Sequence, residues 1–297
     1  MSDTVHIPVL LEESMLVLKV KPGGVYVDGT LGGGSHTEAL LKRSAPNGCV
    51  LSLDVNPKAL EAAGQRLANY GTRWKGKDGN FRYMADLAQE EAINAVDGIL
   101  LDLGFSSDEL LDPMKGISFQ QDGILDMRLG PASNDDGLTA SDIVNSWPKG
   151  EIETMIREFG EERFARRIAE GIVDARKVAS ISRVLDLVAV IKRSVPGNYE
   201  QGRIHPATRT FQALRIAVND EVQALKQAIE QAHRLLAPGG TLAIITFHSI
   251  EDRIVKLAFQ QEDKWEPVSK KPLLPTEHEL ARNPRSRSAK LRAAHKK

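Results

Sequence analysis

The chain has 297 residues, 41% of them hydrophobic, which allows one large domain or two smaller ones with a buried core. A single cysteine, Cys49, excludes an internal disulfide framework, and the lack of any apolar run of about 18 residues excludes a membrane-spanning helix. The net charge is −1, yet the segment from Arg282 to Lys297 has seven basic residues and no acidic one. The N-terminal segment lacks the basic and apolar regions of a signal peptide, so we expect a soluble cytoplasmic protein.

Strand and helix patterns alternate over the first 107 residues. We predict strands at 25–28, in GCVLSLDV (48–55), in FRYMADL (81–87) and in DGILLDLG (97–104). Helical patterns lie between them, in SHTEALLKRS (35–44), PKALEAAGQRLANY (57–70) and AQEEAINAV (88–96). This alternation predicts βαβ units and a parallel sheet.

Residues 108–205 lack strand signals. A turn-rich segment, 108–137, is followed by a Thr139/Asp142 spacing typical of a helix start and by helical patterns over 151–177 and 182–195. Long helices over 205–236, an APGG turn and a fifth strand in TLAIITFHS (241–249) then resume the earlier pattern. We therefore predict an α/β fold with a doubly wound sheet. Its domain comprises residues 1–107 and 206–297, and 108–205 form an all-helical insertion.

The stretch VDGTLGGGSHTEAL (27–40) joins the first strand to its helix, where doubly wound sheets bind ligands. Its four glycines allow a ligand to approach the backbone closely (Gly29, Gly32, Gly33 and Gly34). Neither a dinucleotide G-x-G-x-x-G pattern, which Thr37 interrupts, nor a P-loop G-K-[ST] pattern is present. Ser35 and Glu38 fit a capping box that would occupy the first helical N–H groups. The loop therefore indicates a ligand without a pyrophosphate.

Asp54 ends the second predicted strand, where a carboxylate can accept hydrogen bonds from both ribose hydroxyls of a nucleoside. The alternative is an aspartate that only starts the next helix, before Pro57. The Pro-Gly-Gly turn before the fifth strand adds a third feature. Together, the glycine loop, Asp54 and this turn resemble class I (Rossmann-like) S-adenosylmethionine-dependent methyltransferases.

Eight longer blocks carry a closer resemblance, which runs from His6 to Arg292. They are HIPVLLEE, DGTLGGGSHT, GILLDLGFSS, GISFQQDGILDMRL, FGEERFARRIA, HPATRTFQALRI, FHSIEDRIVK and NPRSRSAKLR, in this order. Together they resemble the bacterial ribosomal RNA small-subunit methyltransferase H family. The resemblance implies an S-adenosylmethionine-dependent enzyme that methylates the exocyclic N4 of a decoding-centre cytidine in 16S rRNA, within the small ribosomal subunit.

The same resemblance implies seven cofactor contacts, at Gly34, Ser35, His36, Asp54, Leu87, Asp102 and Glu109. Ser35 stands where the family often has glycine, and Glu109 where glutamine is frequent; a carboxylate at 109 can accept a hydrogen bond but cannot donate one. Leu87 offers apolar contact and a backbone N–H to adenine, and the neighbouring Asp86 is a rival for the adenine amino group. No metal ligand set is predicted.

Three residues at strand ends are candidates for the chemistry. Asp102 ends the fourth strand, and it could hold the cofactor's amino acid end, accept from the target amine, or only cap the following turn. Phe247 could stack on a flipped base or serve as a core aromatic, and His248 could donate to a base oxygen or phosphate.

Basic residues in the insertion and the tail are candidates for RNA contact: Arg163, Arg166, Arg167, His205, Arg209, Arg285 and Arg287. For the insertion, the alternative is a solvated helix face with Glu–Arg pairs such as Glu162 with Arg166. For the tail, it is a disordered terminus. Three other functions remain open: a small-molecule methyltransferase, a nicotinamide dehydrogenase, disfavoured by the glycine pattern, and a non-catalytic RNA-binding assembly factor.

Overall fold

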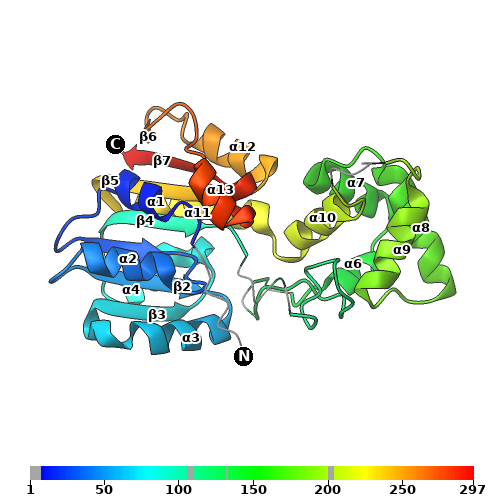
Figure 1. Ribbon diagram of the computed structural model, residues 1–297, viewed down its shortest axis with the longest axis horizontal. Coiled ribbons are helices and arrows are strands. Elements are labelled where there is room, and N and C mark those ends of the chain that lie inside the picture. Colours follow the sequence, from blue (N-terminus) through cyan, green and yellow to red (C-terminus); the bar gives the residue numbers. More distant parts are fainter. Residues whose placement is uncertain (1–7, 106–109, 111, 132, 135, 200–203) are drawn as a thin grey trace. The chain divides into compact units, whose positions relative to one another are not determined.

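The computed structural model describes residues 8–297, apart from 106–109, 111, 132, 135 and 200–203. The chain divides into two compact units, which we call unit 1 (Met1–Ser106 and Val222–Lys297) and unit 2 (Ser107–Glu221). Unit 1 contains a seven-stranded sheet, and unit 2 is helical (Figure 1).

The sheet of unit 1 has the strand order β3-β2-β1-β4-β5-β7-β6. Five strands are parallel: β1 (Val25–Asp28), β2 (Cys49–Asp54), β3 (Trp74–Asp78), β4 (Val96–Asp102) and β5 (Leu236–Thr246). Strand β7 (Lys290–Lys296) runs antiparallel to both β5 and β6 (Trp265–Pro267). The parallel strands end at one edge, which we call the carboxyl edge, and the opposite edge is the amino edge. The predicted α/β class is therefore confirmed.

Helices cover both faces of this sheet. The alternation along β4 shows why, because Leu100 packs on one face while Ile99 and Leu101 pack on the other, and all three are fully buried. The first face carries α1 (Leu11–Val17), α2 (Ser35–Arg43) and α3 (Pro57–Leu67). The second carries α4 (Met84–Glu90), α11 (Glu221–Leu235) and α12 (Ser249–Ala258). Helix α13 (Glu277–Arg282) and the 3₁₀ turn η3 (Pro284–Ser288) precede β7.

The predicted third strand is wrong. Residues Phe81–Tyr83 form the 3₁₀ turn η2 and Met84–Glu90 form α4, whereas β3 lies earlier, at Trp74–Asp78 after the turn η1 (Ala68–Arg73). Strand β3 lies at an edge of the sheet, so it is exposed and carries Lys75 and Lys77 instead of an apolar run. The apolar residues after it have helical spacing, since Met84 and Ala88 share one buried face of α4.

Unit 2 consists of helices around their own apolar core. They are α6 (Ala140–Ser146), α7 (Lys149–Gly160), α8 (Ala165–Val178), α9 (Val184–Ser194) and α10 (Thr208–Val218). Thr139 and Asp142 form the expected capping box at α6. The predicted boundary at 205 is displaced to 221, because Phe211 and Leu214 of α10 are buried in this helical core.

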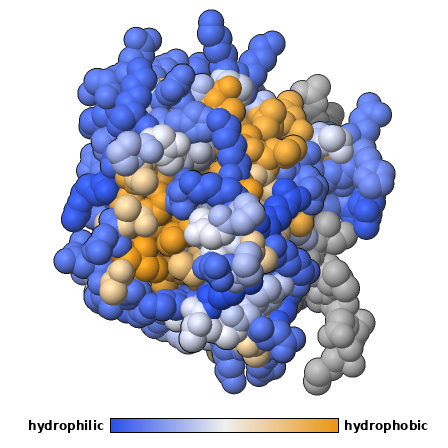
Figure 2. Space-filling model, turned by 90° about the vertical axis from the view of Figure 1, so that its left-hand side faces the viewer, coloured by the Kyte–Doolittle hydropathy of each residue, from blue (hydrophilic) through white to orange (hydrophobic). Residues whose placement is uncertain are grey.

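The end of unit 1 at which β7 finishes is shown in Figure 2. Hydrophilic residues cover most of this face, and apolar groups appear between them in separate patches. Within the described part of the chain, no helix is long and apolar enough to cross a membrane.

Candidate cofactor and acceptor site at the carboxyl edge

Three aspartates end three neighbouring strands at the carboxyl edge of unit 1. Asp28 ends β1, Asp54 ends β2 and Asp102 ends β4. Because β1 lies between β2 and β4, the glycine loop that follows β1 lies between Asp54 and Asp102. This is the place where open parallel sheets bind ligands, so the structure brings the main predicted residues to one edge.

The glycine loop is tied to the end of β2. Gly32 N–H donates to Asp54 Oδ2 at 2.8 Å, and Gly34 adopts a left-handed backbone with φ 75° as the N-cap of α2. The predicted capping box is wrong: Ser35 lies in the first turn of α2, and Ser35 Oγ accepts from Arg66 of α3 at 3.1 Å. Glu38 pairs with the same arginine at 2.5 Å. The N-cap residue Gly34 therefore provides no side-chain cap to α2, while the carboxylate of Glu38 offsets the positive end of the helix.

Asp54 accepts hydrogen bonds on both of its carboxylate oxygens. Oδ2 accepts from Gly32 N–H and Oδ1 accepts from Asn56 N–H, each at 2.8 Å. The half-buried carboxylate therefore orients both the glycine loop and the loop after β2, and its binding to a ribose stays a prediction.

Leu87 lies close to this part of the edge. Gly79 follows β3 and its N–H donates to the Asp54 carbonyl at 3.0 Å, and a Cβ on Gly79 would lie 2.6 Å from Leu87 Cδ1. Asp86 is exposed, and its carboxylate lies 3.6 Å from Arg234 of α11. These contacts favour Leu87 over Asp86 as the residue beside a bound nucleoside. Glu109 lies outside the described residues.

Asp102 is held from three sides. Its backbone N–H donates to Thr30 Oγ1 at 2.7 Å, its Oδ1 accepts from Gly104 N–H at 3.0 Å, and its Oδ2 lies 3.8 Å from His36 Nδ1. The bond to Gly104 is the turn cap that the sequence offered as an alternative. The same carboxylate directs Oδ2 toward His36, on the glycine-loop side.

His36 is buried, and its Nε2 lies 3.1 Å from the Val9 carbonyl, which can only accept a hydrogen bond. Nδ1 faces Asp102. The side chain of His36 thereby connects the segment before α1 to the end of β4.

Asp28 is a functional candidate that the sequence analysis did not single out. Its side chain is fully buried, and it accepts from Thr37 Oγ1 at 2.7 Å and from Thr30 N–H at 3.2 Å. Burial raises the pKa of this carboxyl, although the nearby His36 and the hydrogen bonds oppose the rise. A carboxyl at the end of an apolar strand, directly before the glycines, was the signal that could have identified it.

Phe247 and His248 follow β5 at the same edge. The ring of Phe247 lies against Gly104, where a Cβ would come within 2.7 Å of Phe247 Cζ, so this contact requires glycine at 104. Phe247 is half-buried and packs on the apolar cluster of the α1 face.

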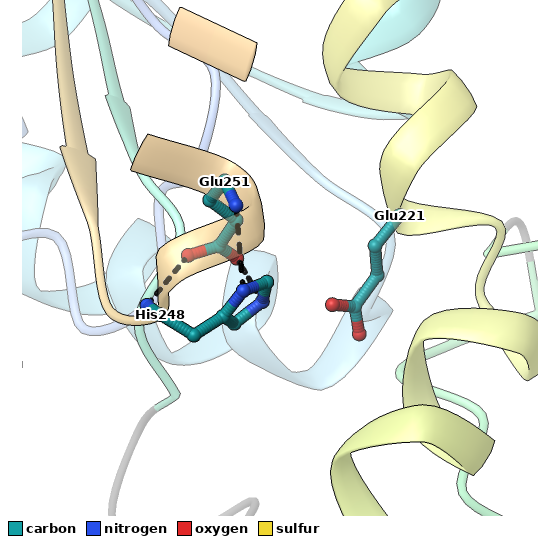
Figure 3. A group of neighbouring side chains, drawn as sticks. All are labelled: Glu221, His248 and Glu251. Carbon is teal, nitrogen blue, oxygen red and sulfur yellow. Dashed lines mark hydrogen bonds and ion pairs between the residues drawn. The ribbon is translucent and has the colours of Figure 1, made fainter. Parts of the chain in front are cut away.

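His248 is committed to its own helix. It is the N-cap of α12, its Nδ1 accepts from Glu251 N–H at 3.4 Å, and its Nε2 lies 3.1 Å from Glu251 Oε1 (Figure 3). Glu251 in turn accepts from Phe247 N–H at 2.8 Å. Both ring nitrogens therefore face Glu251, which leaves the predicted donation to a base or phosphate without support. Glu221, drawn in the same view, is the last residue of unit 2, and Arg215 binds its carboxylate at 2.7 and 2.8 Å.

Comparison with known proteins assigns this arrangement to a family. The model of the MraW methylase family matches residues 3–297, which is nearly the whole chain. The chain belongs to the MraW methylase family. It is 45% identical to the ribosomal RNA small subunit methyltransferase H of Heliobacterium modesticaldum, over 98% of each chain. It is 46% identical to the protein of the same name from Symbiobacterium thermophilum, over 97% of this chain and 95% of that one.

Among solved structures, a putative rRNA methylase from Clostridium thermocellum is similar, with a TM-score of 0.48 and 16% identity over 98% of this chain and 99% of that one. The family predicted from the sequence is confirmed, and with it an S-adenosylmethionine-dependent methyltransferase. The residues at the carboxyl edge fit this cofactor, because a carboxylate ends β2 beside a loop rich in glycine.

In unit 2 of the methylase, some of the predicted arginines contact carboxylates and others contact aromatic rings. Arg166 pairs with Glu170 at 3.2 Å, not with Glu162 as the alternative interpretation expected. Glu162 is buried and accepts from Tyr199 Oη at 2.7 Å. Arg163 lies over the rings of Phe164 and Tyr199, at 4.9 and 4.8 Å from their centroids.

The other three predicted residues of unit 2 also contact aromatic side chains. Arg167 lies 5.8 Å from the Phe164 ring, and Arg209 donates to Tyr199 Oη at 2.7 Å. His205 stacks on Phe119 with a centroid distance of 4.7 Å, and burial lowers the pKa of its imidazole, with Lys192 adding to the effect. Arginine and aromatic side chains thus occur together in unit 2.

Proposed function

We propose that this methylase transfers a methyl group from S-adenosylmethionine to the exocyclic N4 of a cytidine in 16S rRNA, within the small ribosomal subunit. The observation that carries the proposal is Asp102, whose carboxylate ends β4 at the carboxyl edge with Oδ2 directed toward His36. The names of the relatives support the ribosomal RNA substrate. The methylated atom is the finer part of the proposal.

The chemistry requires help for the acceptor more than for the donor. The bound cofactor supplies a methyl group that its positive sulfur already activates. The lone pair of cytosine N4 is delocalised into the ring, so the site must hold the amine N–H groups and align nitrogen, methyl and sulfur at near-attack distance. Asp102 Oδ2 accepts from one N–H and draws the nitrogen toward tetrahedral geometry. The N–CH3 bond forms as the S–CH3 bond breaks, and the N4 proton becomes acidic and is released to solvent water, so no strong base is required.

Phe247 positions the flipped base. A cytosine within rRNA structure must leave its stack before N4 can reach the cofactor. The half-buried Phe247 ring beside Gly104 offers a stacking face next to Asp102. Unit 2 supplies further contacts to the RNA, and the joint occurrence of Arg163 and Arg167 with aromatic rings supports this role.

The decisive experiment identifies the product. Isolated small ribosomal subunits that lack the modification are incubated with the purified enzyme and methyl-labelled cofactor, and the rRNA nucleosides are separated by mass spectrometry. We expect the label in N4-methylcytidine. Label on cytosine C5, on a ribose 2′-oxygen or on a small molecule alone contradicts the proposal, and binding without any transfer supports a non-catalytic assembly factor.

The first prediction concerns Asp102→Asn, which keeps the size and one acceptor but removes the charge. If the carboxylate polarises the amine in the transition state, kcat falls sharply while cofactor affinity changes little. Single-turnover methyl transfer and calorimetry measure the two effects. Asp97→Asn is the matched control, because Asp97 lies at the amino end of the same strand and pairs with Lys21 at 2.7 Å. Full activity of Asp102→Asn removes the carboxylate from the mechanism, and lost affinity assigns it to the cofactor.

A further inference from the structure

The seven basic residues between Arg282 and Lys297 separate into two groups. Four of them hold the C-terminal strand in place. Lys290 and Arg292 bind the carboxylate of Asp252 at 3.0 and 2.6 Å, and Lys296 and Lys297 donate to the carbonyls of Leu236 and Glu262 at 2.7 and 2.6 Å. The alternative interpretation of the tail as a disordered terminus is therefore wrong, and these four charges form contacts within the fold.

The other three basic residues are exposed. Arg282 ends α13, and Arg285 and Arg287 belong to η3, immediately before β7. No acidic residue occurs between Arg282 and the end of the given sequence. We call Arg282, Arg285 and Arg287 the arginine turn.

The arginine turn lies at the carboxyl edge of unit 1. Strand β7 runs antiparallel to β5, and Lys290, its first residue, pairs with Thr246, the last residue of β5. The segment before Lys290 is therefore at the edge where β1, β2 and β4 end in Asp28, Asp54 and Asp102. Three arginines thus share an edge with the proposed cofactor and acceptor site.

The backbone of the turn is fixed although its arginines are exposed. Ser286 is fully buried, and its Oγ donates to the Asn283 carbonyl at 2.7 Å. Ala289 is also buried and its N–H donates to the Ser286 carbonyl at 2.8 Å. A fixed backbone that alternates buried small residues with exposed arginines presents its charges at reduced entropic cost.

Helix α13 also joins the turn to the segment that binds His36. Glu279 Oε1 accepts from Leu10 N–H at 2.8 Å, and the carbonyl of Val9, the preceding residue, accepts from His36. The turn is thereby anchored to the same stretch of chain that orients the histidine beside Asp102.

We propose that the arginine turn is a docking surface for backbone phosphates of the RNA that carries the acceptor base. The inference rests on the proposed function, since it takes the acceptor to be RNA. Arginine guanidinium groups match phosphate geometry in a bidentate manner. The location of the turn favours RNA over another acidic partner. A ligand bound to the arginine turn lies at the same edge as the site that receives the base. Phosphate contacts fix the register of the RNA and leave the choice of base to the site.

The second prediction tests this surface through salt dependence. The triple variant Arg282→Gln, Arg285→Gln, Arg287→Gln is compared with wild type for binding to transcribed small-subunit rRNA over a series of KCl concentrations. Each phosphate contact contributes roughly 0.7 to 0.9 to the slope of log K against log salt. We expect the slope to fall by about 2 to 3, while the methylated nucleotide stays the same.

The matched control removes three lysines at the amino edge and so changes the net charge equally. Lys19, Lys21 and Lys264 are all exposed there. Lys19 Nζ lies 3.3 Å from His295 Nε2, Lys21 Nζ lies 2.7 Å from Asp97 near the start of β4, and the Lys264 carbonyl accepts from Lys297 N–H at 3.0 Å. We expect the triple Lys→Gln variant to keep the wild-type slope. An equal loss of slope in both triple variants overturns the proposal, because it assigns the effect to net charge.

A variant that keeps the three positive charges distinguishes loss of phosphate contacts from misfolding. If the glutamine variant loses cofactor affinity, the triple Arg→Lys variant is used, and we expect it to retain a slope close to that of wild type. A wild-type slope in a folded glutamine variant overturns the docking surface even when N4-methylcytidine is formed. Conversely, a reduced slope with label outside cytosine N4 contradicts the proposed function and leaves the docking surface intact.

Discussion

In the protein without a ligand, the Asp54 carboxylate accepts hydrogen bonds from two backbone amides of unit 1. The Gly32 and Asn56 amides orient its carboxylate at 2.8 Å each, so the residue that we propose to bind the ribose also fixes the glycine loop. A ligand that binds here meets acceptors that are already positioned, and little ordering remains to be done on binding.

The third prediction follows from this residue. Asp54→Ala leaves two ribose hydroxyls without their partner and should weaken S-adenosylmethionine binding by roughly 1.5–3 kcal/mol, the range for hydrogen bonds to a charged group. Calorimetry measures the affinity, and thermal unfolding detects any loss of the loop. Asp78→Ala is the control, because Asp78 is exposed and lies opposite Asp54 in the register of the neighbouring strand β3. Unchanged affinity for Asp54→Ala refutes the ribose assignment.

Single residues were predictable where the strand end alone determined their position. Asp54 and Asp102 each end an apolar run, and the parallel sheet brings such ends to one edge. Partners were not predictable where they come from distant parts of the chain. Ser35 is bound by Arg66 of α3, and Glu162 is bound by Tyr199, which lies after α9. Sequence spacing alone suggested nearer partners in both cases.

At the level of elements, the link between α12 and β7 depends on one carboxylate. Asp252 of α12 binds both Lys290 and Arg292 of β7. Burial alone would raise the pKa of Asp252, but the hydrogen bonds from Arg292 and Lys290 outweigh it and hold the pKa below its usual range. A depressed pKa in the folded state contributes stability that is present above the unfolded pKa and is lost as the pH falls through the folded pKa.

The fourth prediction is that Asp252→Asn is less stable than wild type at neutral pH by roughly 1.5–3 kcal/mol. The difference should shrink as the pH falls below the usual carboxyl pKa of 3.8, because wild-type Asp252 then becomes protonated too. Urea unfolding at a series of pH values measures it. Asp263→Asn, at an exposed position, is the control and should match wild type throughout. A difference that stays constant into the acid range rules out the charge as its cause.

The strands with apolar runs were predicted from the sequence, whereas the edge strands β3 and β6 and the neighbouring β7 were not. β1, β2, β4 and β5 are buried on both faces, which gives them continuous apolar sequences. Strand β3 is an exposed edge and β6 has three residues, so neither has such a run. Strand β7 reads KLRAAHK, and its charged residues obscure a strand whose Leu291, Ala293 and Ala294 are buried.

At the level of the whole molecule, each unit has its own core. The fifth prediction is that Ile168→Ala, in the fully buried core of unit 2, destabilises that unit by about 2–5 kcal/mol and leaves cofactor affinity unchanged. Leu51→Ala, in the core of unit 1, should instead reduce cofactor affinity. Hydrogen exchange followed by mass spectrometry reports protection in each unit separately. Equal loss of protection in both units after Ile168→Ala shows that the two unfold as one.

The pairing of β4 with β5 is a contact between segments that are far apart in the sequence. These strands are neighbours in the sheet, where Asp102 of β4 lies opposite Ile245 of β5. In the sequence they are separated by the whole of unit 2. Bringing them together closes a long loop, whose entropic cost rises with the number of flexible residues, and such non-local pairing is slow. A folded unit 2 removes most of those flexible residues. An insertion that folds on its own core therefore lowers the entropic cost of pairing β4 with β5.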